Sequence, residues 1–364
     1  CNDSKIIMQS KSKHIKENCS KWVRASLLTI STCVICINLT AQDFHLSQFF
    51  NTSLLRNPAL AGVFSGNLRL QTVYRNQWQS IGFPYQTHVF TGEYKFSAGE
   101  SNDFMTIGAS AAYDVAGQMK MKTLQMMPVV NYHKSLSGLR NAYLSGGFSA
   151  GITSRQFDGR NLTFDNQFTG GRFNSSAASG EWFYGLSRSF FDIGAGLSLN
   201  ADAGAQANWY VGASLWHFHK PEISFLGSEI ELLPKYQFNA GLRSNIATDV
   251  VFTTEANYLK QGPYTEFIGG VGIMCQLPNN GFYGETGVDG FGIGGGLFMR
   301  LNDAVIPYFQ LSLNHFDLGL SYDVNTSRLK TASQGRGGFE LSLTYRGFTG
   351  QSGSTPRSTF CPRF

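Results

Sequence analysis

Apolar and polar residues alternate strictly in many stretches of this chain, and this pattern constrains the fold more than any other feature. One stretch, 316–323, has an apolar residue at every second position, namely Phe316, Leu318, Leu320 and Tyr322. A second stretch, 339–346, follows a polar loop and repeats the pattern with Phe339, Leu341, Leu343 and Tyr345. Successive side chains of a β-strand point to opposite faces, so each stretch predicts a strand with one apolar and one polar face.

The same alternation recurs along most of the chain. It is clear in 68–78, 87–96, 142–153, 235–243 and 304–313, and weaker in 103–114, 124–133, 191–200, 207–217, 250–258, 267–275 and 292–300. With the C-terminal pair, these segments predict about 14 antiparallel strands in one continuous meander. No stretch after residue 41 reaches the ~18 consecutive apolar residues that indicate a transmembrane helix.

Two all-β folds compete for this pattern. In a soluble sandwich the strands are usually short, about 5–6 residues, and their apolar faces pack together. In an outer-membrane barrel, strands of about 9–11 residues present their apolar faces to lipid. The segments here are long, and charged residues make up only 15% of the chain, against about 25% in soluble domains. The sequence therefore predicts an all-β transmembrane outer-membrane β-barrel of about 14 antiparallel strands.

The first 41 residues have the pattern of an export signal. Six of the 29 basic residues precede residue 42, and they are followed by the apolar stretch "ASLLTISTCVICINLTA" at 25–41. This stretch is typical of a secretory signal and is shorter than the ~20 residues of a membrane anchor. We expect a signal peptide at 1–41, with 1–7 upstream of a true start at Met8, and export to the cell outer membrane.

The rest of the chain divides by pattern. We expect 42–64 to form an N-terminal periplasmic or lumen-plugging segment, 65–348 the barrel, and 349–364 a C-terminal tail. Two of the 24 acidic residues also precede residue 42, so the remaining chain is nearly neutral and no nucleic-acid partner is implied. Cys275 and Cys361 are the cysteines outside the expected signal. They could pair in an oxidising compartment, which the spacing does not decide.

Three motifs resemble catalytic or ligand-binding patterns but have the wrong context. The G-x-S-x-G spacing around Ser149 lies within an alternating strand, whereas a nucleophile elbow needs a strand-to-helix turn. The glycine-rich stretch 290–295 lacks the helix and the acidic residue of a dinucleotide site, so strand packing explains it better. His217 and His219 would share one face of a strand, but no third metal ligand is spaced nearby. We therefore predict no catalytic residue, no cofactor and no metal.

Long polar loops separate some of the strands. They lie at 153–183, 219–234 and 323–337. Long loops on one rim of a barrel usually carry recognition, although a loosely ordered solvated cover is the alternative. We interpret these loops as surfaces for partner contact.

Both ends of the expected mature chain resemble one protein family. The stretch "FHLSQFFNTSLLRNPALAGVFSGNLRLQTVYRNQWQSI" at 44–81 resembles the opening of the PorP/SprF family, outer-membrane proteins associated with type IX secretion and gliding motility. The other end agrees in the last two strands and in the terminal "CPRF", whereas 282–289 looks inserted relative to the family pattern. The matching residues, which we expect to be structural or partner-facing, are Ser47, Gln48, Phe49, Asn57, Pro58, Ala59, Gly62, Tyr74, Arg75, Asn76, Trp78, Ser321, Tyr322, Asp323, Asn325 and Ser327.

The resemblance implies a non-enzymatic barrel that works with the type IX machinery. Its partners would be outer-membrane lipid and a protein, either a secreted adhesin or other cargo of that system or a periplasmic anchoring protein. A general outer-membrane channel for small solutes is the alternative, because about 14 strands enclose a lumen wider than its own side chains fill. We further expect 42–62 to fold into or beneath that lumen, with Phe44, Leu46, Phe49 and Phe50 packing against inner residues.

Overall fold

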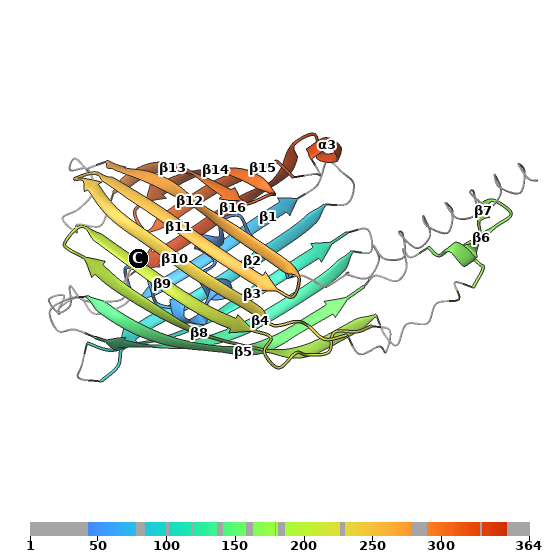
Figure 1. Ribbon diagram of the computed structural model, residues 1–364, viewed down its shortest axis with the longest axis horizontal. Coiled ribbons are helices and arrows are strands. Elements are labelled where there is room, and N and C mark those ends of the chain that lie inside the picture. Colours follow the sequence, from blue (N-terminus) through green and yellow to red (C-terminus); the bar gives the residue numbers. More distant parts are fainter. Residues whose placement is uncertain are drawn as a thin grey trace, which may run out of the picture. The chain divides into compact units, whose positions relative to one another are not determined.

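The alternating segments form a closed antiparallel barrel in the computed structural model of the protein (Figure 1). The structure describes residues 43–77, 84–99, 102–117, 120–136, 141–157, 163–178, 180, 186–225, 230–277, 290–327 and 330–347. Within these residues, fourteen strands close the barrel in the order β1-β16-β15-β14-β13-β12-β11-β10-β9-β8-β5-β4-β3-β2. The predicted fold and its strand number are therefore confirmed.

The strands match the alternating segments with small shifts at their ends. Their bounds are β1 (Leu68–Gln77), β2 (Tyr85–Ser97), β3 (Phe104–Ala116), β4 (Met121–Ser135), β5 (Ala142–Gln156), β8 (Ser187–Ala203), β9 (Ala207–Trp216), β10 (Lys235–Ala247), β11 (Val250–Gln261), β12 (Tyr264–Leu277), β13 (Phe291–Arg300), β14 (Ala304–Leu313), β15 (Phe316–Asn325) and β16 (Arg336–Gly347). The barrel closes where β1 pairs with β16, from Leu68 opposite Gly347 to Gln77 opposite Gly338.

The two faces of the barrel wall differ as the alternation predicts. Leu318, Leu320 and Leu341 lie on the outer face and remain 48%, 47% and 42% exposed, which suits contact with lipid chains. Their polar neighbours face the lumen, where Ser321, Glu340 and Ser342 are buried. In hydrocarbon an unpaired backbone N–H or C=O is costly, so closure of the sheet removes the edges that lipid could not solvate.

The two ends of the barrel differ in the lengths of the connections between strands. At the end where β1 begins, β2–β3, β4–β5, β8–β9, β10–β11 and β14–β15 are joined by connections of two to six residues. We call this the short-turn end; β12 also ends there and β13 begins there. At the opposite, long-loop end, the connections 157–186, 217–234 and 326–335 emerge together. They contain η4 (Asp165–Gln167), the hairpin β6 (Phe168–Thr169) and β7 (Arg172–Phe173), and α3 (Lys330–Ser333).

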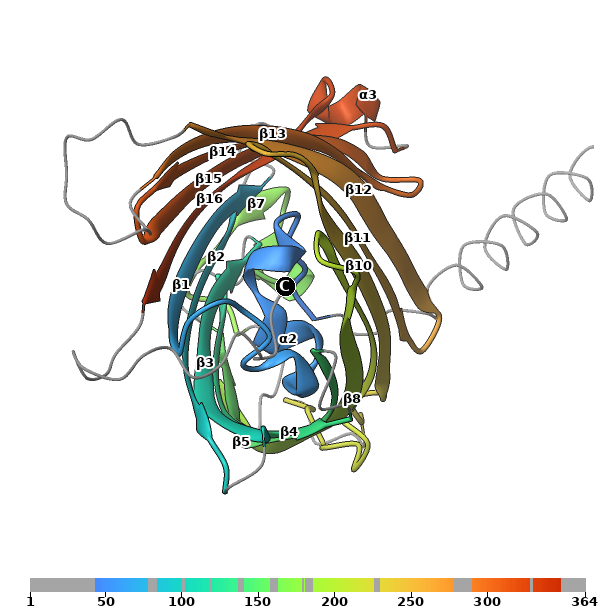
Figure 2. The same cartoon turned by 90° about the vertical axis from the view of Figure 1, so that its left-hand side faces the viewer.

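Residues 43–64, which we call the lumen segment, lie inside the barrel (Figure 2). They contain η1 (Phe49–Asn51), α2 (Ser53–Arg56) and η2 (Pro58–Leu60). Asp43 contacts His217 and Lys235 at the long-loop end, and the Phe64 carbonyl accepts from Nζ of Lys95, near the end of β2 at the short-turn end, at 2.7 Å. The lumen segment therefore runs the length of the barrel before β1 begins.

Some sequence predictions fall outside the described part of the chain. They are the signal peptide at 1–41 with Met8, Trp78, the inserted stretch 282–289, the tail after Gly347, and Cys361. Cys275 is exposed with a free thiol. Among the described residues, no helix is long and apolar enough to cross a membrane.

Candidate functional site in the barrel lumen

The lumen segment is fixed near the long-loop end by a buried ionic cluster around Ser47. We call Ser47, Arg75, Arg300, Asp323 and Glu340 the Ser47 cluster. The Ser47 hydroxyl donates to Oδ1 of Asp323 at 2.6 Å, and accepts from Nη1 of Arg75 and Nη2 of Arg300, each at 2.7 Å. Arg75 also forms ion pairs with Asp323, at 2.9 Å, and with Glu340. The cluster thus joins the lumen segment to β1, β13, β15 and β16.

Glu340 holds the backbone of the lumen segment directly. Its two carboxylate oxygens accept from the backbone amides of Ser47 at 2.6 Å and Gln48 at 2.7 Å. The Gln48 side chain donates to the Ser321 hydroxyl at 3.1 Å and to the Glu340 carbonyl at 3.0 Å. Glu340 is fully buried, and a buried carboxylate is tolerated only when cations and donors surround it. Removal of one partner would therefore leave an unpaired charge inside the barrel.

A second attachment lies midway along the lumen, where Asn57, Pro58 and Ala59 pack on glycines of the wall. The Asn57 amide donates to the carbonyls of Leu197 at 3.1 Å and Ala213 at 3.2 Å, and its Oδ1 accepts from the Ala59 amide at 2.8 Å. A Cβ on Gly196 would lie 1.9 Å from Oδ1 of Asn57. Only a wall without side chains at this point lets the segment approach so closely.

Gly147, the first glycine of the G-x-S-x-G spacing, packs against the same attachment. A Cβ on Gly147 would lie 2.4 Å from the carbonyl carbon of Pro58. Ser149 sits in the middle of β5, and its hydroxyl donates to the Pro128 carbonyl at 2.8 Å. The motif therefore belongs to a strand that packs against the lumen segment, and it has no strand-to-helix turn.

The lumen segment turns towards the barrel wall at two glycines that follow the Asn57–Pro58 step. The step contacts β8 and β9 in mid-lumen, whereas the chain turns towards β1 at Gly62 and Gly66, whose φ angles are +84° and +101°. A Cβ at Gly62 would collide with Thr106 Oγ1 at 2.0 Å. The backbone amide of Gly62 donates to Glu93 at 2.9 Å. Both the conformation and the tight space require glycine there.

Apolar contacts fill the space between these attachments. Phe49 and Phe50 pack against Phe298, with ring centroids 5.8 and 4.9 Å away, and Phe50 also meets Tyr308 at 5.0 Å. Leu46 joins a buried cluster with inner residues of β1, β2 and β3, and Phe44 packs against it. Burial of these side chains adds hydrophobic stabilisation, typically about 1.5–3 kcal/mol for each side chain fully buried.

At the long-loop end, Asp43 and His217 form a third attachment. Nε2 of His217 lies 2.9 Å from Asp43, and its Nδ1 lies 2.7 Å from Asp192. Lys235 contacts Asp43 at 2.6 Å. Burial alone raises the pKa of Asp43, but the charges of Lys235 and His217 outweigh it and hold that pKa well below its usual range. Burial lowers the pKa of His217, but Asp43 and Asp192 outweigh it and raise that pKa above its usual value.

The predicted strand geometry of His217 and His219 is wrong. β9 ends at Trp216, and His217 has a φ of +56°, so the two histidines do not share a strand face. His219 bonds to the Phe191 carbonyl at 2.8 Å. Within the described chain, no group of three or more His, Cys, Asp or Glu residues could hold a metal.

The structure divides the residues of the family motifs between the lumen, the outer wall and a loop. Ser47, Gln48, Phe49, Asn57, Pro58, Ala59 and Gly62 belong to the lumen segment, and Arg75, Ser321 and Asp323 reach it from the wall. Tyr74, Asn76 and Tyr322 lie on the outer face of the wall. The ring centroids of Tyr74 and Phe339 are 5.9 Å apart. Asn325 accepts from Ser327 and donates to Ser333 of α3, so this pair shapes the β15–β16 loop.

Sequence reasoning did not identify several residues that anchor the lumen segment. Arg300, Glu93 and Asn131 were not singled out, although each lies at an inward position of an alternating strand. Asn131 donates to the carbonyls of Ala59 at 2.9 Å and Ala61 at 2.7 Å. Asp43 and Asp192 were also missed, because nothing local marks them as partners of His217.

Comparison with solved structures found outer-membrane barrels of low similarity. The Ralstonia pickettii toluene transporter TbuX is 10% identical with a TM-score of 0.47, covering 82% of this chain and 94% of its own. The P. putida toluene transporter TodX is 11% identical with a TM-score of 0.44, covering 83% of this chain and 95% of its own. The KdgM porin is 7% identical with a TM-score of 0.35, covering 76% of this chain and 98% of its own.

Comparison with curated proteins gave no match. A family model does match, described as "Type IX secretion system membrane protein PorP/SprF", over residues 38–345. The matched range contains the lumen segment and every strand except the last two residues of β16. The chain is therefore a member of the PorP/SprF family of type IX secretion system membrane proteins.

Proposed function

We propose that this membrane component of the type IX secretion system is a non-enzymatic docking protein, which holds or helps export a partner protein at the outer membrane. The observation that carries the proposal is the occupation of the lumen. The lumen segment is bonded to the wall near the long-loop end, in mid-lumen and near the short-turn end. A barrel filled by its own chain suits a rigid platform better than an open pathway.

The long-loop end offers the surface for a partner. In outer-membrane barrels the short turns are periplasmic and the longer loops extracellular, so we infer that 157–186, 217–234 and 326–335 face outward. Phe168 and Phe173 of the β6–β7 hairpin are 56% and 45% exposed. Exposed aromatic side chains on loops supported by a rigid scaffold are typical of recognition surfaces. A secreted adhesin or other cargo fits this side, and an anchoring protein of the periplasm fits the short-turn end.

A gene deletion complemented by loop variants tests the proposal. We expect deletion to remove at least one protein from the cell surface, and wild-type protein to restore it. A variant with 163–178 replaced by a short Gly-Ser linker should reach the outer membrane but fail to restore the surface protein. As a control, Gly-Ser replacement of the short connection 204–206 at the short-turn end should restore it.

The alternative function, a channel for small solutes, predicts the opposite phenotype. Deletion would then impair uptake of a nutrient while the set of surface proteins stayed unchanged. That result would overturn the docking function.

A further inference from the structure

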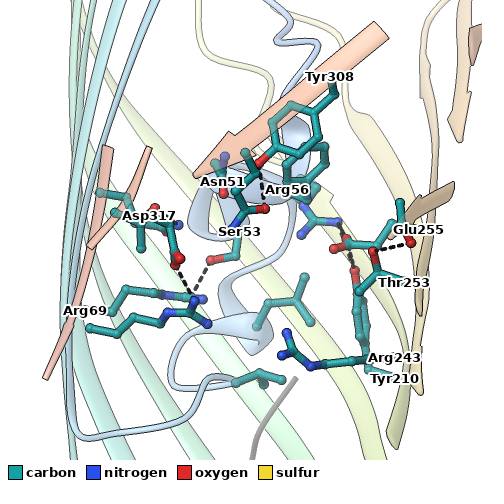
Figure 3. A pocket seen from close by; sticks show the side chains of 18 of the residues that line it. Asn51, Ser53, Arg56, Arg69, Tyr210, Arg243, Thr253, Glu255, Tyr308 and Asp317 are labelled. Carbon is teal, nitrogen blue, oxygen red and sulfur yellow. Dashed lines mark hydrogen bonds and ion pairs between the residues drawn. The ribbon is translucent and has the colours of Figure 1, made fainter. Parts of the chain in front are cut away.

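A cavity of about 150 Å³ lies between the lumen segment and the barrel wall (Figure 3). The last strand, β16, lines it with Thr344 and Arg346 and ends one residue later, at Gly347. The Arg346 side chain is 33% exposed, so the cavity is accessible from the short-turn end. The chain therefore leaves its last strand at the edge of this cavity.

One wall of the cavity is aromatic. The ring centroid of Phe50 lies 4.9 Å from that of Phe298 and 5.0 Å from that of Tyr308, and all three residues line the cavity. Gly272 of β12 also lines it and has no side chain to fill the space. A cavity of about 150 Å³ accommodates a benzene ring, and aromatic rings favour edge or offset contact with one another. The space therefore suits the side chain of a phenylalanine.

Guanidinium groups form other parts of the lining. Arg56 pairs with Glu255 at 3.2 Å, and Arg69 pairs with Glu93 at 2.7 Å. Each guanidinium also lies over an aromatic ring of the lumen segment, at 5.2 Å and 4.5 Å from the ring centroid. Planar guanidinium groups stack favourably on aromatic rings. The lining therefore favours an aromatic group and requires no further charge.

One buried donor at the cavity has no acceptor among the described residues. The Nε of Arg56 has no hydrogen-bond partner there, although the Arg56 side chain is only 7% exposed. Its Nη1 already donates to Tyr210 at 3.0 Å and to Glu255 at 3.2 Å. A buried N–H of a charged group is unfavourable when it is left unsatisfied, and a backbone carbonyl brought into the cavity would supply the acceptor. The cavity therefore fits a polypeptide segment that carries an aromatic side chain.

The segment 348–364 of this chain has the required composition and starting point. It follows Gly347 directly, lies outside the described residues, and contains Phe348, Phe360 and Phe364. Ten extended residues span about 33–36 Å, so the segment is long enough to turn back into the lumen. Because it is covalently attached, its effective concentration at the cavity is on the order of millimolar. A separate molecule would have to compete with that concentration.

We propose that residues 348–364 fold back into the lumen from the short-turn end and place the phenylalanine at 360 or 364 in this cavity. A backbone carbonyl of the segment accepts from Nε of Arg56, and the ring lies against Phe50 and Phe298. The barrel is then closed by two segments of its own chain, one that precedes β1 and one that follows β16. This closure goes beyond the docking function and does not depend on it.

Cysteine crosslinking in the full chain tests the proposal, because Cys361 lies beside Phe360 in the sequence. Thr253 lines the cavity from β11, and Thr253→Cys adds a thiol of similar size. In a Cys275→Ser background, we expect a short bis-maleimide to join this thiol to Cys361, as identified by mass spectrometry. The matched control Thr254→Cys, at the adjacent position on the outer face, should not form the crosslink. No crosslink from Thr253→Cys, or equal crosslinking from both positions, would overturn the proposal.

A variant that ends at Gly347 provides a second test. The probe is the dye-labelled peptide 348–364, and its fluorescence anisotropy measures binding to the variant in detergent. We expect saturable binding to this variant and at least about tenfold weaker binding to the full chain, where the attached segment occupies the site. A peptide carrying Phe360→Ser and Phe364→Ser should bind at least about tenfold more weakly. No saturable binding, equal binding of the two peptides, or equal binding to the variant and the full chain would contradict the proposal.

Discussion

The backbone amide of Ser47 donates to the carboxylate of Glu340 at 2.6 Å, across a sequence separation of 293 residues. Ser47 precedes the first strand, and Glu340 lies in the last strand, which closes the barrel on β1. Closure of the barrel and attachment of the lumen segment therefore share one residue. The Ser47 cluster forms only when both ends of the chain are in place.

Glu340→Gln should destabilise the folded barrel strongly. The substitution removes the negative charge that Arg75 and the amides of Ser47 and Gln48 contact. Breaking a buried ion pair typically costs about 3–5 kcal/mol. We expect this loss in the free energy of unfolding in detergent, measured by urea titration with heat-modifiable electrophoresis as the readout.

Arg188→Gln is the control for this prediction. Arg188 pairs with Glu222 at the surface of the long-loop end, where both side chains are substantially exposed. Exposed ion pairs contribute little, so its unfolding midpoint should match that of the wild type. An equal shift in both variants would show that Glu340 has no special part in closure.

Gly147→Ala should disturb the mid-lumen attachment. The added Cβ would lie 2.4 Å from Pro58 backbone, and overpacking of this kind typically costs about 1–3 kcal/mol. Gly146→Ala is the matched control, because its Cβ has only Leu197 Cδ2 within reach, at 3.7 Å. Thermal unfolding in detergent should show a lower midpoint for Gly147→Ala alone; equal midpoints would contradict the close packing.

The attachment at the long-loop end should depend on pH. Because the pKa of His217 is raised, the contribution of this residue to the stability of the attachment is complete below about pH 6.5. That contribution is lost as the pH rises through the raised pKa. Because the pKa of Asp43 is lowered, the contribution of this residue to the stability of the attachment is present above about pH 4. That contribution is lost as the pH falls through the lowered pKa. Asp43 is therefore held best between these two limits.

Hydrogen exchange of the peptide that contains residues 43–46 measures this dependence. After correction for the intrinsic effect of pH, we expect protection to fall on the alkaline side in the wild type. His217→Gln should remove that alkaline step, whereas Lys134→Gln, a change at the exposed partner of Asp103, should retain it. A step that persists in His217→Gln would assign the titration to another group.

The alternation predicted the barrel and its strand number because the period of two is a local property of the chain. It also placed Arg75, Asp323 and Glu340 on polar faces. It could not show which of them meet, since that depends on closure between β1 and β16. The resemblance to the family marked Ser47, Asn57 and Arg75 but gave no partners for them.

The lumen contacts were harder to predict for a physical reason. Asn57 packs against Gly196, which in the sequence resembles any other strand glycine. Asp43 contacts His217 only because the lumen segment runs the full length of the barrel. The strand geometry of His217 was predicted wrongly because the alternation continues past Trp216, whereas the backbone turns there.

Conductance in planar lipid bilayers tests most directly whether the lumen segment closes the barrel. The wild-type protein should insert without open-channel steps, because the segment is fixed at three levels of the lumen. The double variant Arg75→Gln, Glu340→Gln should show intermittent openings, since it frees one of these anchors. Steady ohmic conductance of the wild type, equal to that of the double variant, would contradict a closed docking barrel and favour a channel.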